Sequence, residues 1–406
     1  MCFMKNNLLN QKNNFINLKW KNHWGIIIFL LLMVRLIIMM PKSPSEMSDT
    51  WSTLFYAIDY KTMGFVPRAF VGSVCSLFFD YISEQTVYII ALCATIVLIA
   101  IVSLLIGKVI KKQSGYESIV FLFMISAFLL APCDVHYLFG CAHMGINDLY
   151  FIMLTILAVI CSTHKIGRWF IPLICVVCMA IYEGYPFAFG ALIGIILLYM
   201  ICKSEKKAAP IIITILTILV VAASFLYFYI FFRADYLDTI KFDTLEQTVE
   251  ALSKRTEIQV PSYMFEQFYF WDSAMSLFTD GRWNVSEIWE STRTIRKTCM
   301  PTFLIMFTAS CSLWISSFRS EENKFLKCIY LFCVLAPLSS LPLFLLSEQL
   351  KYISYNIFTQ LILVGFFSLK EKAFLKSSEK IGKFLRNNPL LMPVGWLIVI
   401  LSGTFF

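Results

Sequence analysis

The sequence predicts an all-α, polytopic integral membrane protein, and three observations lead to this fold class. Of the 406 residues, 59% are hydrophobic and only 15% are charged, whereas a soluble domain averages about 45–50% apolar and 25% charged residues. Several apolar runs approach or exceed the ~18 residues that a helix needs to cross a bilayer. Basic residues gather in short loops between these runs, as the positive-inside rule describes.

We expect about eleven transmembrane helices in a single transmembrane domain, residues 1–406. Their expected limits are 24–40, 86–107, 118–132, 147–162, 169–182, 186–202, 208–232, 299–318, 325–346, 353–369 and 390–406. The runs at 118–132 and 169–182 are short for a full crossing, so each is either a short helix extended by polar neighbours or a re-entrant piece. The first run, "WGIIIFLLLMVRLIIMM", is expected to be a retained signal anchor.

Charge in alternate loops predicts the orientation. One set of loops, including "GKVIKKQ" and "CKSEKK", is short and basic, and the other set is poor in basic residues apart from the loop 233–298. We therefore predict an N-terminus inside, a first outer loop over 41–85 and a large outer loop over 233–298 with amphipathic helices. The net charge of +8 is attributed to this anchoring and not to a nucleic-acid partner.

The first candidate site lies in the first outer loop, in "IDYKTMGFVPRAFVGSV". Gly64 and Pro67 fit a turn that enters a helix at Arg68. An arginine at that entry can hold a phosphate with two hydrogen bonds. Alternatively, Arg68 reaches a lipid headgroup or pairs with Asp59.

The second candidate, "LLAPCDVHYLFGCAHMGINDLYF", brings Asp134, His136, His143 and Asp148 into a short outer loop. A histidine can act as a general base that a carboxylate orients. The alternatives are a divalent-cation site, or interfacial histidines with a helix cap at Asn147. No compact ligand spacing supports a metal, so the prediction includes neither a metal nor a cofactor.

Two further candidates lie later in the chain. In "MAIYEGYPFAFG", Glu183 precedes the helix-breaking Gly184 and Pro186, which indicates either a base or orienting carboxylate, or a plain hairpin turn. In the 233–298 loop, "FDTLEQTVEALSKRTEI" predicts an amphipathic helix. Three arginines near the end of that loop could grip a lipid pyrophosphate or simply contact headgroups: Arg282, Arg293 and Arg296.

The whole chain resembles, in architecture, the Wzy-type polymerases of O-antigen or capsule repeat units. The local resemblance is "DYKTMGFVPRAFVGS", which is similar to an Asp-Tyr, Gly-Phe, Arg, Gly pattern of polymerase-like proteins. It implies a multi-pass protein of the bacterial cytoplasmic membrane. The implied activity joins undecaprenyl-pyrophosphate-linked oligosaccharide repeat units at the outer face. The implied partners are that lipid-linked oligosaccharide, membrane lipid, and the flippase and chain-length regulator of the same pathway.

The resemblance also implies residue roles. The implied catalytic residues are Asp59, His136, His143 and Glu183, and the implied substrate-binding residues are Arg68, Asp134, Arg282, Arg293 and Arg296.

Two other functions remain open. A glycosyltransferase of the GT-C type, which uses a polyprenyl-phosphate sugar donor, would place acidic residues in the first outer loop, but no adjacent acidic pair occurs there. A lipid-linked oligosaccharide flippase would need polar groups along a path through the membrane, and Arg35 is the exception within an otherwise apolar set of span centres.

Overall fold

The computed structural model describes residues 23–47, 54–113, 115–131, 145, 147–231, 244–258, 300–341 and 349–403. In the first half of the chain its elements are α2 (Trp24–Met39), η2 (Pro44–Glu46), α4 (Tyr60–Met63), α5 (Phe70–Cys75), α6 (Glu84–Lys112), α7 (Glu117–Leu130), α9 (Asp148–Ser162), η3 (Gly167–Phe170), α10 (Ile171–Ile181) and α11 (Tyr185–Lys203). The remaining elements are α12 (Ala208–Phe225), η4 (Leu226–Phe231), α13 (Leu245–Ser253), α18 (Met300–Ser320), α19 (Lys324–Leu335), η6 (Ala336–Ser340), α21 (Gln349–Lys370), α22 (Lys372–Asn387) and α23 (Leu391–Gly403).

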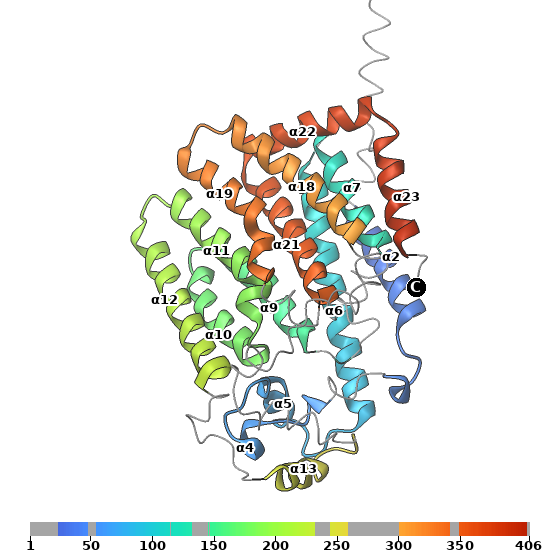
Figure 1. Cartoon of the computed structure of the whole chain (residues 1–406), viewed down its shortest axis with the longest axis vertical. Coiled ribbons are helices and arrows are strands. Elements are labelled where there is room, and N and C mark those ends of the chain that lie inside the picture. Colours follow the sequence, from blue (N-terminus) through green and yellow to red (C-terminus); the bar gives the residue numbers. More distant parts are fainter. Residues whose placement is uncertain are drawn as a thin grey trace, which may run out of the picture.

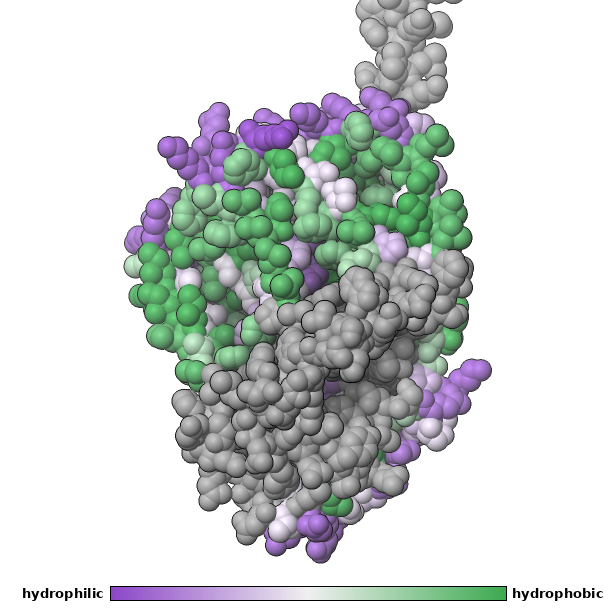
Figure 2. All heavy atoms as spheres, in the orientation of Figure 1, coloured by the Kyte–Doolittle hydropathy of each residue, from purple (hydrophilic) through white to green (hydrophobic). Residues whose placement is uncertain are grey.

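The predicted all-α fold class is confirmed in its coarse form. Within the described ranges there is no β-strand, and five helices are long and apolar enough to cross a membrane. Four shorter apolar helices accompany them, and a helix occupies part of every range predicted to span. An apolar belt separates hydrophilic residues at the two ends of the molecule (Figure 2). The count of eleven spans and their orientation stay predictions.

The two ends differ in what they carry (Figure 1). At the lower end in Figure 1, which we call the loop end, the short helices α4 and α5 lie near α13. At the opposite end, which we call the basic end, α22 lies across the bundle. The charge pattern predicts a basic loop over residues 369–388, but most of these residues form α22, which meets α23 at an angle of 87°. Lysines on one face and apolar side chains on the other allow this helix to lie along a membrane surface.

Sequence signals account for the helix boundaries. The Ser83 hydroxyl accepts the backbone N–H of Thr86 at 3.1 Å and caps α6, while Lys111 and Lys112 complement the negative end of the helix dipole. Prolines lie in the first turns of α10 and α11, where a missing N–H costs nothing.

The arginine within the first predicted span has a structural explanation. Arg35 of α2 donates to the carbonyl oxygens of Leu129 and Ala131, the second at 2.9 Å. These carbonyls end α7 and lack partners within the helix. At the opposite end of α2, the helix packs on α6 where Gly25 faces Gly107, so closely that a Cβ on Gly107 would lie 2.8 Å from the Gly25 Cα. Small residues at such a crossing are typical of helix packing in membranes.

Candidate functional site

Polar and charged side chains from five parts of the chain gather at the loop end. We call this set the loop-end cluster, and its members are Asp59, Arg68, Asn147, Asp148, Glu183, Arg255 and Tyr355. Asp59 and Glu183 are 0% and 3% exposed, and Asn147 and Asp148 are 6% and 7% exposed. Charged residues are almost never this buried unless they are paired.

Arg68 and Glu183 form a bidentate ion pair. Arg68 Nε donates to Glu183 Oε2 at 2.9 Å, and Nη2 donates to Oε1 at 2.8 Å. The guanidinium also lies over the rings of Phe55 and Tyr182, at 5.6 and 5.2 Å from their centroids. Two parallel charge-assisted hydrogen bonds and two aromatic faces fix the orientation of this guanidinium. The alternative in which Arg68 pairs with Asp59 is therefore wrong.

The backbone around Arg68 is unusual. Its φ is 61°, in the left-handed region, and it is the only described non-glycine residue with a positive φ. The helix predicted to begin at Arg68 begins at Phe70 instead, because a left-handed residue cannot lie inside an α-helix. Such a conformation costs about 1–3 kcal/mol and is maintained only where surrounding contacts enforce it. The pair with Glu183 is such a contact.

A glycine allows close packing within the loop that carries Asp59 and Arg68. A Cβ on Gly72 would lie 1.9 Å from the carbonyl oxygen of Ile58 and 2.7 Å from that of Phe55. Only glycine permits α5 to approach this backbone so closely. On the same helix, the Ser73 hydroxyl accepts the N–H of Tyr60 at 2.9 Å. These contacts hold Asp59 and Arg68 in one compact loop.

Asp59 has a buried capping role. Its carboxylate accepts the N–H of Thr62 at 2.6 Å and thereby caps α4, and it forms an ion pair with Nη1 of Arg255. The same Nη1 donates to the Thr62 hydroxyl at 3.1 Å. The positions of Asp59 and Arg255 thus depend on each other, although the two residues are 196 positions apart in the sequence.

Arg255 is placed by the segment that follows the predicted amphipathic helix, which the structure confirms as α13. The carbonyl oxygen of Arg255 accepts the N–H of Ile82 at 2.8 Å, and the Thr256 hydroxyl donates to the Ile82 carbonyl at 2.7 Å. The Arg255 side chain is 14% exposed, and burial lowers its pKa from the ordinary value. Among the described residues, neither Nε nor Nη2 has a hydrogen-bond partner.

The third part of the cluster joins α9 to α21. Tyr355 donates its hydroxyl to Asp148 at 2.5 Å. Phe151 stacks on Tyr182 with 5.4 Å between centroids and meets the ring of Tyr355 at 5.7 Å. Since Tyr182 also faces Arg68, these rings form a continuous packed path between Arg68 and Asp148. Rigid aromatic packing of this kind keeps polar groups in fixed positions.

Asn147 lies just before α9, but its side chain makes no capping hydrogen bond. Both its amide nitrogen and its amide oxygen are buried and have no partner among the described residues. The capping alternative for Asn147 is therefore wrong. A buried amide without partners costs roughly 1–3 kcal/mol, which a ligand that reaches it would offset.

The structure brings two predicted site residues, Arg68 and Glu183, into contact, while Asp59 lies in the same loop as Arg68 but pairs with Arg255. The other predicted site residues lie outside the described residues: Asp134, His136, His143, Arg282, Arg293 and Arg296. Sequence reasoning missed Arg255 as a site residue. The only available signal was its place at the end of an amphipathic helix in an outer loop. In the described ranges, His, Cys, Asp and Glu form no group of three that could hold a metal ion.

Comparison of the chain with protein-family models, with curated proteins and with solved structures finds no match. The function is therefore argued from the geometry of the loop-end cluster.

Proposed function

We propose that the protein joins undecaprenyl-pyrophosphate-linked oligosaccharide repeat units at the outer face of the bacterial cytoplasmic membrane. The observation that carries this proposal is the Arg255 guanidinium, whose Nε and Nη2 are buried and lack partners among the described residues. Arginine presents these two N–H groups as a fork that matches a phosphate. Nη1 is already engaged by Asp59 and Thr62, so the fork is held in place before a ligand arrives.

A second arginine supports the same chemistry. Arg68 lies in the loop that also holds Asp59, and its guanidinium is fixed by Glu183. In this proposal Arg255 contacts the lipid pyrophosphate, and Glu183 holds the Arg68 guanidinium in position at the same end of the bundle. Preorganised cations stabilise the negative charge that develops on a departing pyrophosphate.

An apolar groove beside the cluster fits the lipid chain of such a donor. The groove, of about 340 Å³, lies between α10, α11 and α12 and includes Tyr185, Pro186, Phe187 and Phe225. Tyr185 is two residues from Glu183, so the groove begins next to the Arg68–Glu183 pair and continues toward Leu197. We assign one part of the polyprenyl chain to this groove, which is too small for the whole chain, and the pyrophosphate to the arginines.

The proposed reaction balances without a cofactor. A hydroxyl oxygen of the acceptor repeat unit attacks the anomeric carbon of the donor glycan, and a new glycosidic bond forms as the bond to pyrophosphate breaks. The hydroxyl proton passes to a base, for which His136 and His143 remain the proposed residues, and the pyrophosphate stays on its lipid. Asn147, whose amide donor and acceptor atoms lack partners in the part of the chain that the structure describes, is proposed to bind sugar hydroxyls.

Deletion of the gene in its host tests this function. The proposal predicts that the surface polysaccharide, separated by length on a gel, collapses from a ladder to a single repeat unit. Complementation by the wild type should restore the ladder, and complementation by Arg255→Ala should not. A ladder that persists with one sugar missing would instead identify a GT-C-type transferase, and complete loss of polysaccharide would indicate a flippase.

A further inference from the structure

A cavity at the basic end lies far from the loop-end cluster along the helix bundle. It has a volume of about 330 Å³ and lies between α6, α7, α9 and α21. Its walls are mainly apolar and include Phe121, Ile125, Phe358 and Leu361. Small-molecule sites typically measure about 300–1,000 Å³ and have mostly apolar walls with a few polar groups. This cavity has the same character.

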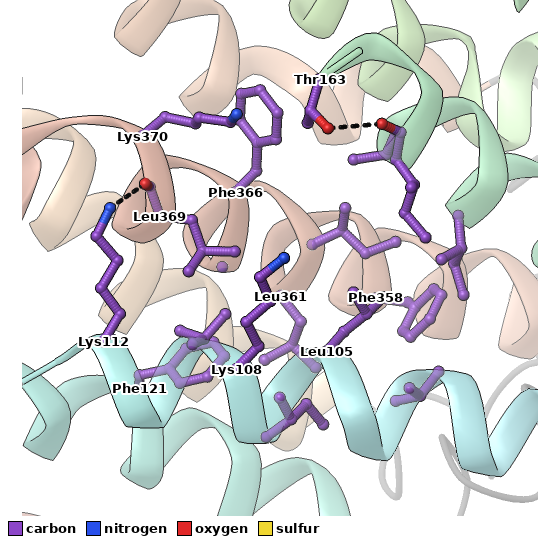
Figure 3. Close-up of a pocket in the computed structure, with 18 of the residues that line it drawn as sticks. Leu105, Lys108, Lys112, Phe121, Thr163, Phe358, Leu361, Phe366, Leu369 and Lys370 are labelled. Atoms are coloured by element: carbon purple, nitrogen blue, oxygen red, sulfur yellow. Dashed lines mark hydrogen bonds between the residues drawn. The ribbon is translucent and has the colours of Figure 1, made fainter. Parts of the chain in front are cut away.

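The polar groups of the cavity are predominantly cationic. Lys108 and Lys112 line it from α6, and Lys370 lines it from the end of α21. Figure 3 shows these three lysines around the apolar side chains, with Lys112 donating to the carbonyl oxygen of Leu369. Among the residues that the structure describes, no acidic side chain lines the cavity. The nearest acid in sequence, Glu371, is already bound by Lys203 at 2.9 Å and by the Tyr199 hydroxyl at 2.6 Å.

General anchoring explains lysines at this end of the bundle, but it does not explain three lysines around an apolar cavity. We propose that this cavity binds a phosphorylated lipid of the adjacent leaflet, with its phosphate among Lys108, Lys112 and Lys370 and part of one chain inside. The volume is too small for a whole lipid. Lysine ammonium groups are common phosphate ligands, and the apolar walls favour a hydrocarbon chain. Under the predicted orientation, this is the cytoplasmic leaflet.

The test titrates three probes against the purified full chain in a non-ionic detergent, with bound species counted by native mass spectrometry. Dioleoyl phosphatidic acid supplies both phosphate and chains, dioleoylglycerol supplies the chains alone, and inorganic phosphate supplies the head alone. We expect binding of phosphatidic acid and much weaker binding of the other two. Equal binding of dioleoylglycerol, or equal binding of inorganic phosphate, would overturn the proposal.

Matched variants locate the site. The triple variant K108Q, K112Q and K370Q should bind phosphatidic acid about tenfold more weakly or worse, because three charges at the phosphate are removed. The control K111Q, K206Q and K207Q removes the same charge from exposed lysines at the basic end that do not line the cavity. If both triple variants lost the same affinity for phosphatidic acid, the lipid would be attracted by surface charge alone, and the proposal would be overturned.

A third variant tests the cavity itself. Gly365 lines the cavity, and a Cβ there would meet Val109 only at 3.4 Å, which is ordinary contact. Gly365→Leu places a larger side chain at this wall of the cavity, so a variant with the wild-type Tm should bind phosphatidic acid more weakly while all three lysines remain. Unchanged binding in a folded Gly365→Leu protein would contradict a chain inside the cavity.

Discussion

Arg68 and Glu183, 115 residues apart, fix each other through two hydrogen bonds of 2.9 and 2.8 Å at the loop end. The Glu183 side chain is 3% exposed, so its charge depends on this arginine for compensation. Removal of one partner from a buried ion pair leaves an uncompensated charge, whereas removal of both is often nearly neutral. The pair therefore makes a prediction about stability as well as about function.

Arg68→Met should lower the free energy of unfolding by about 3–5 kcal/mol, measured by denaturant titration of the detergent-solubilised protein. The double variant Arg68→Met with Glu183→Met should recover most of that loss but remain inactive. Lys254→Met breaks an ion pair with Glu250 whose side chains are both 71% exposed, and it should change stability little. An Arg68→Met protein as stable as the wild type would show that the pair does not hold the loop.

Gly72→Ala should destabilise the first outer loop, because its Cβ would lie 1.9 Å from the Ile58 carbonyl oxygen. Overpacking of this kind costs typically about 1–3 kcal/mol, and occasionally more, because backbone must move. Gly194→Ala is the matched control in α11, where a Cβ meets nothing within 4 Å. Thermal unfolding should show a lower Tm for Gly72→Ala alone, and equal Tm values would refute the close approach.

Substitution of Asn147 should affect function without lowering stability. Asn147→Leu removes two buried polar atoms that have no partners among the described residues, so it should leave stability unchanged or raise it. Gln360→Met is the control, because Gln360 accepts from Trp314 and donates to the Cys333 carbonyl, and it should destabilise by about 1–3 kcal/mol. If Asn147 binds sugar, Asn147→Leu also shortens the polysaccharide ladder. A full ladder would remove Asn147 from the proposed site.

The predicted orientation can be tested with single cysteines. Lys254 and Lys206 are both exposed and lie at the loop end and the basic end, respectively. Lys254→Cys should react with a membrane-impermeant thiol reagent on intact cells, and Lys206→Cys should react only after permeabilisation. The wild type, with its own thirteen cysteines, gives the background. The reverse labelling pattern would place the loop end inside and contradict the proposed site of reaction.

The helices were predictable because long apolar runs bounded by charged residues leave few other folds in a membrane. The amphipathic α22 was missed because "LKEKAFLKSSEKIGKFLRNN" contains many charges, although its apolar residues recur at helical spacing. The number of lysines indicates a basic loop, whereas the spacing of the apolar residues indicates a helix. Periodicity was the signal that could have revealed this helix.

The ion pairs could not be predicted, because they depend on contacts between distant segments. Asp59 was expected near Arg68, but its side chain turns back to cap α4, and the left-handed backbone at Arg68 accompanies a pairing with Glu183 instead. A β-bridge between Ile82 and Thr256 holds the segment that carries Arg255 near the first loop, and there Arg255 pairs with Asp59. Nothing in the local sequence specifies that bridge.

We propose that this chain transfers a glycan from one lipid pyrophosphate to another at the loop end. An assay in vitro adds purified protein to lipid-linked repeat units extracted from the deletion strain. Our account predicts longer lipid-linked glycans, with one undecaprenyl pyrophosphate released for each new linkage, and no product from an Arg255→Ala protein that folds normally. Repeat units that remain single in the presence of the folded wild type, with no pyrophosphate lipid released, would contradict it.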